Sequence, residues 1–245
     1  GLFETTRLLN QQLEFEGLHL KRLAYGLQCL FFEDVDEILS TLKKQLAAIL
    51  PVYAASYSAC KLIISRNSQQ RGYSPANSTV DIIIQLFNRQ PHANSAALSV
   101  GLCTTALSEN KQLAGVKHLN RLDNVLAKAE IDSKNWHEGW MCCADGWVHD
   151  GVQSNLFYRI NQQWFTPPIV KAGVKGVQRQ AILSVASHLI AIRAIHKTEL
   201  TQIEAAFMTN RLMGMTPIGL LQGRSLDDCQ AFIQYLHDQM DSQDV

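Results

Sequence analysis

Residues 113–122 read LAGVKHLNRL, and the rest of the chain is best understood from this segment. It places Lys117 just ahead of apolar residues at helical spacing, which predicts an amphipathic helix. The predicted apolar face consists of Leu119, Leu122, Val125, Leu126 and Ala129. Because most lysines are ordinary surface residues, the meaning of Lys117 depends on what accompanies it along the chain.

The composition is that of a globular chain without a strong electrostatic bias. Its 245 residues are enough to bury one large core or two modest ones. Lysine plus arginine and aspartate plus glutamate both number 22, so no basic excess points to nucleic acid. The apolar run of residues 46–55 is interrupted by Pro51 and is too short to span a membrane. We expect a cytoplasmic protein that acts on a small molecule and binds neither nucleic acid nor membrane.

The six cysteines give no sign of a metal site or a disulfide framework. They are scattered at positions 29, 60, 103, 142, 143 and 229, without a Cys-x-x-Cys pair. No histidines stand at zinc-binding spacing from them. We expect reduced thiols, as in a cytoplasmic protein, and no metal.

The segment around Lys117 resembles the Schiff-base lysine segment of the fold-type IV pyridoxal-phosphate enzymes. Its Lys-His-Leu-Asn-Arg-Leu form is most similar to that of the aminodeoxychorismate lyases, which make 4-aminobenzoate for folate synthesis. The resemblance implies pyridoxal 5'-phosphate as the cofactor, with Lys117 as both its attachment point and the general base. It also implies a mixed α/β (α+β) fold of two domains, with the cofactor in the cleft, and a homodimer.

A domain boundary is expected in the polar, proline-bearing residues 90–94. We predict a small N-terminal α/β domain of residues 1–92 and a larger C-terminal domain of residues 93–245 that binds pyridoxal phosphate. The chain opens directly on an alternating strand at residues 1–8, where the resembled family has a further strand ahead of it. The N-terminal domain is therefore expected to lack its first strand.

Asp150 is the point where the chain departs from the family. The family has Thr-Glu where this sequence has His149-Asp150, and its glutamate pairs with the protonated pyridine nitrogen of the cofactor. The Ser-Asn-Leu-Phe of residues 154–157 matches the family and fixes the register. Aspartate is one methylene shorter but keeps the charge, so the resemblance assigns the same role to Asp150. The alternative is a carboxylate that merely flanks the hairpin turn at residues 144–146.

Two further segments resemble the phosphate-binding parts of the family. Glycines at 173 and 176 precede a predicted helix, and amides at a helix start bind anions. The resemblance puts the amides of Val177 and Gln178 on the phosphate. It assigns a second phosphate turn to Asn210 and Arg211, where Arg211 replaces a small residue. Its side chain either leaves the site or adds a second cation.

Three residues of the first half complete the predicted site. Arg22 lies in a His-x-x-Arg-Leu motif whose arginine contacts the cofactor phosphate in the family, although a solvated helix residue is the plainer interpretation. Arg71 and Tyr73 lie in a loop between predicted strands at residues 61–66 and 80–87. This loop is either a plain surface hairpin or, as in related enzymes, a clamp for substrate carboxylates that reaches across a dimer.

The function predicted by these motifs is conversion of 4-amino-4-deoxychorismate to 4-aminobenzoate and pyruvate. A D-amino-acid or branched-chain aminotransferase of the same fold is the first alternative, because it would use the same lysine and phosphate-binding segments. A catalytically silent relative, kept as a binding or structural partner, is the second. The substitutions at Asp150 and Arg211 are its only support.

Overall fold

The structure is a computed structural model that describes residues 1–67, 72–75, 79–88 and 97–242. The chain forms two compact units. The first comprises Gly1–Pro91 and Val116–Asn120, and the second comprises His92–Gly115 and Arg121–Val245. The five residues around Lys117 therefore group with the first unit, although the boundary expected from the sequence puts them in the second domain.

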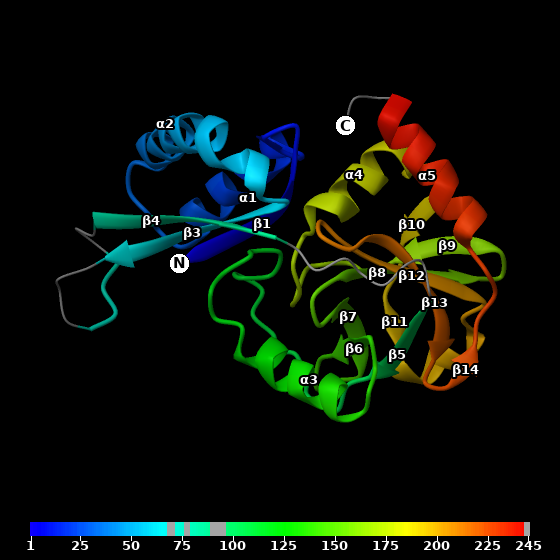
Figure 1. Cartoon of the computed structure of the whole chain (residues 1–245). Helices are drawn as coiled ribbons and strands as arrows, with labels where there is room; N and C mark the ends of the chain where they lie inside the picture. The colour runs from blue at the N-terminus through cyan, green and yellow to red at the C-terminus, as the bar shows by residue number, and fades with distance from the viewer. Residues whose placement is uncertain (68–71, 76–78, 89–96, 243–245) are drawn as a thin grey trace. The chain divides into compact units, whose positions relative to one another are not determined.

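The first unit is an antiparallel sheet covered by helices (Figure 1). Among its described residues four strands pair in the order β2-β1-β3-β4. Its elements are β1 (Leu2–Leu9), β2 (Gln12–Leu13), α1 (Glu16–Cys29), α2 (Val35–Tyr53), the 3-10 helix η1 (Ala54–Ser56), β3 (Ala59–Asn67) and β4 (Thr79–Phe87). Figure 1 shows α1 and α2 lying along one face of this sheet.

The core of the first unit follows from two sequence periods. Leu2, Glu4 and Thr6 alternate along β1 and are buried, so one face of the strand lies under the helices. Helix α2 buries Ile38, Leu42, Leu46 and Leu50, which are four residues apart and form one stripe. The alternation on β1 therefore turns the Glu4 carboxylate inward. That carboxylate needs partners.

The second unit is built on one large mixed sheet. Its described strands pair in the order β10-β9-β8-β12-β13-β5-β6-β7-β11, with β14 beside β13. The strands are β5 (Leu98–Leu102), β6 (Glu138–Cys142), β7 (Trp147–Gly151), β8 (Asn155–Ile160), β9 (Gln163–Thr166), β10 (Ile190–Ile192), β11 (Ile195–His196), β12 (Ala205–Asn210), β13 (Gly214–Leu221) and β14 (Arg224–Ser225). The helices are α3 (Leu122–Ser133), α4 (Val177–Ala186), the 3-10 helix η2 (Lys197–Gln202) and α5 (Gln230–Ser242). The mixed α/β class expected from the sequence is confirmed.

The predicted apolar face of the helix after Lys117 is wrong. Leu122, Val125 and Leu126 on α3 are between 61% and 69% exposed, and Ala129 is exposed as well. The helix instead buries Ala127 and Ile131, which pack in a cluster with Cys103 and Met141. Because α3 carries two apolar stripes, helical periodicity found a stripe but not the one that faces the core.

The C-terminal helix also begins later than predicted. The sequence predicts a helix from Ser225, but Arg224 and Ser225 pair with β13, and α5 starts at Gln230. The Asp228 carboxylate accepts a hydrogen bond from the Gln230 amide at 3.1 Å, which satisfies a donor of the first turn. Leu236 is buried as expected.

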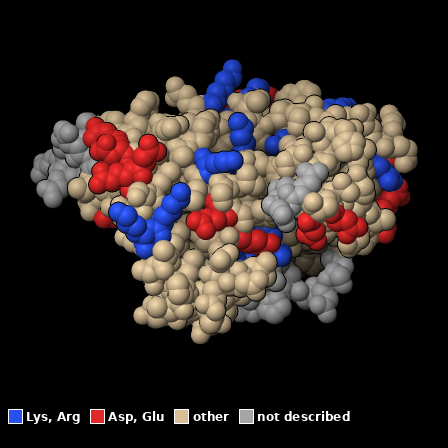
Figure 2. All heavy atoms as spheres, turned by 90° about the horizontal axis from the view of Figure 1, so that it is seen from above, with Lys and Arg blue, Asp and Glu red and all other residues tan. Residues whose placement is uncertain are grey.

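The surface is electrically mixed. Figure 2 shows acidic and basic side chains interspersed on the face in view, in keeping with the zero formal net charge. No described helix has both the length and the apolarity needed to cross a membrane.

The burial pattern of α3 predicts unequal effects of two truncations. Ile131→Ala removes a side chain that is 1% exposed and should lower the free energy of unfolding by about 3 kcal/mol. Leu122→Ala, at 69% exposure, should change it by less than about 0.5 kcal/mol. Urea denaturation at several protein concentrations measures both. A large loss for Leu122→Ala that does not depend on protein concentration would contradict this assignment of the packed face.

Candidate active site

Lys117 is held by the first strand of the first unit. The Phe3 amide donates a hydrogen bond to the Lys117 carbonyl at 3.1 Å, and the Leu119 amide donates to the Gly1 carbonyl at 2.9 Å. The segment thus runs antiparallel beside β1, with a bridge between Leu2 and His118. The Lys117 Nζ lies 4.2 Å from the centroid of the Phe3 ring. Strand pairing and this cation–π contact together fix the direction of the lysine side chain.

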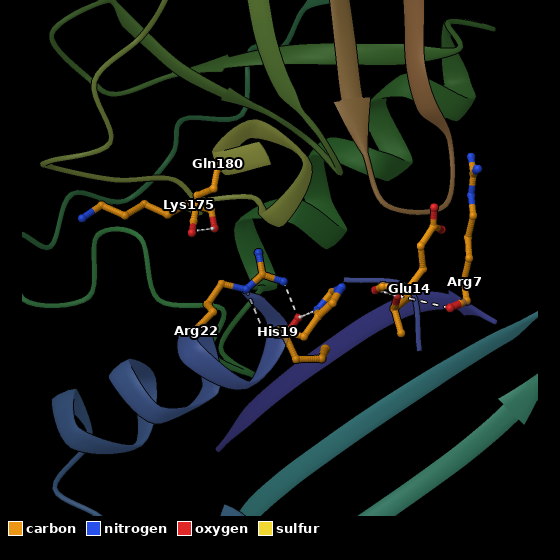
Figure 3. A network of polar contacts seen from close by, with 8 residues as sticks. Arg7, Glu14, His19, Arg22, Lys175 and Gln180 are labelled. Carbon is orange, nitrogen blue, oxygen red and sulfur yellow. Dashed lines mark hydrogen bonds and ion pairs between the residues drawn. The ribbon is translucent and has the colours of Figure 1, made fainter. Parts of the chain in front are cut away.

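Arg22 is buried in an ionic cluster on α1. Its Nε lies 2.8 Å from Glu4 Oε1, its Nη2 donates to Glu4 Oε2, and the His19 Nδ1 lies 2.6 Å from the same carboxylate (Figure 3). Burial alone would raise the pKa of Glu4, but the neighbouring Arg22 and His19 outweigh it and hold that pKa at about 2. With 9% of its surface exposed, Arg22 is not the solvated helix residue of the plainer interpretation.

Adjacent residues of β1 therefore hold two predicted site residues of the first unit. Phe3 contacts Lys117 through its ring, and Glu4 contacts Arg22 through its carboxylate. The sequence analysis did not single out Glu4 or His19. The available signal was an acidic residue at an inward position of an alternating strand, because such a residue requires a buried partner.

Asp150 is buried in the second unit and is held by amide donors. Its Oδ1 accepts from Asn155 Nδ2 at 2.8 Å and from the Gly151 amide at 3.2 Å, and its Oδ2 accepts from the Val174 amide at 2.9 Å. Burial raises the pKa of Asp150 to about 7, although these donors and the charges of Arg121 and Arg179 oppose the rise. A carboxyl group that titrates near neutrality inside a protein is not an ordinary turn residue.

The start of α4 offers amides to an anion. The first hydrogen bond within the helix runs from the Gln180 amide to the Gly176 carbonyl at 2.9 Å. The amides of Val177 and Gln178 precede it, and Gly176 gives them no side-chain cap. Such a helix start carries partial positive charge and suits a phosphate.

Arg211 lies against this helix start. It is 9% exposed, and its Nη1 donates to the Gln178 side-chain oxygen. The guanidinium does not turn out to solvent, which favours the second of the two interpretations, an added cation near the phosphate-binding turn. Gln178 therefore takes part through its buried side chain as well as its amide.

Asn210 builds the neighbouring turn with its side chain. Its Oδ1 accepts from the Leu212 amide at 3.0 Å and the Met213 amide at 2.7 Å, and its Nδ2 donates to the Gln153 carbonyl at 3.1 Å. The side chain thereby shapes the β12–β13 turn and ties it to the residues that follow Asp150. Direct contact of Asn210 with a cofactor stays a prediction.

The two predicted substrate residues are not joined to the rest of the site. Tyr73 is fully exposed, and Arg71 lies outside the described residues. Their roles stay predictions.

Two residues beside Asp150 were not predicted from the sequence. Asn155 belongs to the motif that fixes the register, yet it is also 5% exposed and contacts the carboxylate directly. Arg179, one residue past the predicted amide pair, is buried and donates to Thr166 Oγ1 at 3.2 Å and to the Pro167 carbonyl at 2.9 Å. An arginine within the first turn of a helix was the available signal.

The residues of the second unit fit a phosphorylated pyridine cofactor. The buried Asp150 carboxylate requires a nearby cation in order to ionise fully, which a protonated pyridine nitrogen supplies. The amides at the start of α4 and the buried Arg211 suit a phosphate dianion. These features of the second unit suit a pyridoxal-phosphate enzyme, and the fold is of the mixed α/β class.

The chain belongs to the family described as amino-transferase class IV, which matches residues 1–221. Pyridoxal phosphate is the cofactor of this family, which confirms the predicted cofactor. The aminodeoxychorismate lyase of Vibrio harveyi is 30% identical over 232 residues, covering 89% of this chain and 82% of the relative. The branched-chain-amino-acid aminotransferase of Escherichia coli K12 is 24% identical over 189 residues, covering 67% of this chain and 61% of that protein.

Solved structures agree with this assignment. The 4-amino-4-deoxychorismate lyase of Pseudomonas aeruginosa superposes with a TM-score of 0.87 and 29% identity, over 99% of this chain and 90% of that one. A hypothetical aminotransferase of Mycobacterium tuberculosis in its PLP-bound form gives a TM-score of 0.81, over 99% of this chain and 89% of that one. At 18% identity it supports the fold alone.

Stability of the cofactor-free chain should depend on pH through Asp150. Its pKa is raised from 3.8 to about 7, so between these values the folded state keeps a proton that the unfolded state has lost. The free energy of unfolding therefore falls as pH rises through this window, by on the order of 4 kcal/mol for a shift of about three units. Asp150→Asn should gain stability relative to the parent chain between pH 4.5 and 8, measured by urea denaturation.

The control for this experiment is Asp145→Asn on an exposed hairpin. The pKa of Asp145 is lowered, chiefly by its hydrogen bond with Lys171, so its removal should give no such gain. Parallel pH profiles for the parent chain and Asp150→Asn would mean that Asp150 does not titrate in this window.

Proposed function

We propose that this chain is a pyridoxal-phosphate-dependent lyase that converts 4-amino-4-deoxychorismate to 4-aminobenzoate and pyruvate, a step of folate synthesis. The observation that carries the proposal is the 30% identity, over 89% of the chain, to the lyase of Vibrio harveyi. The lyase structure from Pseudomonas aeruginosa supports it at 29% identity. The aminotransferase of Escherichia coli is less similar and matches less of the chain, at 24% over 67%.

The proposal gives each site residue one task. Lys117 carries the cofactor, and Asp150 pairs with its pyridine nitrogen. The phosphate is held by the amides of Val177 and Gln178, by the turn of Asn210 and Arg211, and by Arg22. When bound, pyridoxal phosphate supplies the electron sink for the reaction. We further propose that the two compact units correspond to the two predicted domains, apart from residues 116–120, which group with the first unit.

Asp150 sets the charge of the pyridine nitrogen. As an ionised carboxylate, Asp150 would hold a proton on that nitrogen, and a cation there would favour ionisation of Asp150 despite its burial. The donors from Asn155 and Val174 keep the carboxylate oriented while it does so.

Lys117 moves the proton. Its Nζ, when uncharged, accepts the proton from the ring carbon that bears the substrate's amino group. Loss of that proton and cleavage of the bond between the ring and the enolpyruvyl oxygen make the ring aromatic. The electrons of the broken bond leave with the enolate of pyruvate, which takes up a proton on its methylene carbon to give pyruvate. The Phe3 ring, 4.2 Å from Nζ, stabilises the ammonium that results.

The second candidate is an aminotransferase of the same family. It rests on the similarity to branched-chain-amino-acid aminotransferases and would use the same Lys117, Asp150 and phosphate-binding residues. The silent-relative alternative loses its two supports. The Asp150 substitution retains a buried carboxylate, and the Arg211 substitution is accommodated against Gln178.

We also propose a cytoplasmic homodimer in which Arg71 and Tyr73 serve a neighbouring site. The exposed Tyr73 and the exposed α3 stripe of Leu122, Val125 and Leu126 support a partner surface. Sedimentation should give a species of twice the 27.4 kDa chain mass. Leu126→Glu should shift it toward the monomer, while Leu9→Glu, at a 60% exposed residue of the first unit, should not. A strict monomer with full activity would exclude the cross-subunit role.

Turnover without a keto acid distinguishes the lyase from the aminotransferase. Enzyme mixed with 4-amino-4-deoxychorismate alone should release many equivalents of 4-aminobenzoate and of pyruvate, because a lyase needs no second substrate. Lys117→Ala should lower the rate at least about a thousandfold, as expected when the general base and attachment point are lost together. Borohydride should fix the cofactor on Lys117 of the parent chain.

The opposite result would favour the aminotransferase. Turnover that stops after one equivalent, together with rapid amino-group exchange between D-alanine or a branched-chain amino acid and 2-oxoglutarate, would overturn the lyase proposal. Labelling of Lys111 or Lys128 in place of Lys117 would overturn the assignment of the site itself.

A further inference from the structure

The Asn155 side chain lies between the Asp150 carboxylate and the segment that leads into α4. Its Nδ2 donates to Asp150 Oδ1 and to the Val174 carbonyl, each at 2.8 Å. An amide nitrogen carries two hydrogens, so both donors of Asn155 are in use. With 5% of its surface exposed, the side chain makes these bonds out of contact with solvent.

Gly176 shows how closely Asn155 approaches the start of α4. Its φ of −61° and ψ of 140° are open to any residue, so its conformation does not require glycine. A Cβ at this position, however, would overlap the Asn155 side-chain oxygen. The absence of a side chain at position 176 is therefore explained by Asn155, which stands where that side chain would be.

Asp150 contacts the same segment. Its Oδ2 accepts from the Val174 amide at 2.9 Å, and a Cβ added at Gly173, whose φ is +86°, would lie 3.2 Å from that oxygen. Residues 173–176 are thus held by both the carboxylate of Asp150 and the amide of Asn155.

We propose that Asn155 is a positioning residue that locks the Asp150 carboxylate and the start of α4 into one preformed arrangement. The two groups that meet opposite ends of the cofactor in the proposed function are thereby set before the cofactor binds. The inference rests on the proposed function only for the use made of Asp150. The locking itself is a property of the chain.

Ionisation of Asp150 depends on this lock. Among the described residues, the hydrogen bonds to its carboxylate come from Asn155, Val174 and Gly151. The charged groups that face it, Arg121 ahead of α3 and Arg179 on α4, act on it through their charge. Loss of the Asn155 donor removes a contact made best by the ionised form, so it should favour the protonated acid.

The decisive experiment is a double-mutant cycle on the full chain, with and without pyridoxal phosphate. Asn155→Ala should raise the pKa of Asp150, followed by carboxyl NMR, by about one unit and weaken cofactor binding at pH 7 about tenfold. Gly176→Ala should do the same, because the new methyl displaces Asn155. In the Asn155→Ala background Gly176→Ala should cost almost nothing in melting temperature, since the methyl enters vacated space.

Two further variants complete the design. Asn155→Asp keeps the shape but replaces both donors with acceptors, so it should raise the Asp150 pKa further than Asn155→Ala does. Gly17→Ala on α1, where an added Cβ meets nothing within 4 Å, is the matched control and should leave both readouts unchanged.

Additive effects of Asn155→Ala and Gly176→Ala on the melting temperature would overturn the proposal. A Gly176→Ala variant that binds cofactor normally with Asn155 intact would overturn it too. An Asn155→Asp variant with an unchanged Asp150 titration would overturn it as well. Failure of the proposed function has a different signature. Asp150→Asn would then leave cofactor affinity and turnover intact, while the coupling between positions 155 and 176 persists.

Discussion

One electrostatic constraint shapes the second unit, the burial of the Asp150 carboxylate. Asp150 is held by three N–H donors, and burial still raises its pKa to about 7. Dipoles that point at a carboxylate reduce the cost of burying its charge but do not remove it. The backbone between β9 and α4 is adapted to the buried carboxylate. A Cβ at Gly173 would come close to Asp150, and a Cβ at Gly176 would overlap the Asn155 side chain. A cationic ligand beside such a carboxyl group would favour its ionised form.

The first unit solves the same problem in the opposite way. Glu4 is as deeply buried as Asp150, but Arg22 and His19 contact it and its pKa falls to about 2. The charge of Glu4 is therefore balanced by Arg22 and His19, whereas the hydrogen bonds described for Asp150 come from uncharged amide groups. Two buried carboxyl groups with pKa values pushed apart have different tasks. Glu4 orients the Arg22 guanidinium within the first unit, and the roles of Arg22 and Asp150 toward a cofactor stay predictions.

The sequence predicted the features that depend on local patterns and on the order of motifs along the chain. The mixed α/β class and the pyridoxal-phosphate cofactor both depend on short runs of residues that can be read in order, while the roles of Lys117 and Asp150 stay predictions. It chose the wrong stripe on α3, because Leu122 and Ile131 look equally apolar until their surroundings are known. The role of Asn155 was missed for a related reason. Its contacts are with Asp150 and with residues about twenty positions further on, and spacing along the chain does not reveal which segments a fold brings together.

The contact with Asn155 explains how Asp150 can replace the family's glutamate. A shorter side chain reaches less far from its strand, so its carboxylate position depends more on what surrounds it than on its own rotamers. Here Asn155 donates a hydrogen bond to Oδ1 of Asp150 and the Val174 amide donates one to Oδ2. The two bonds together fix the plane of the carboxylate as well as its position. Gly176 gives Asn155 the room to do so. The negative charge can therefore be kept while the side chain becomes shorter, provided that the neighbours hold the aspartate at a fixed position relative to the anion-binding turn.

None of these contacts distinguishes a lyase from an aminotransferase, because both need the same proton on the same ring nitrogen. The choice of reaction must be made by residues that touch substrate.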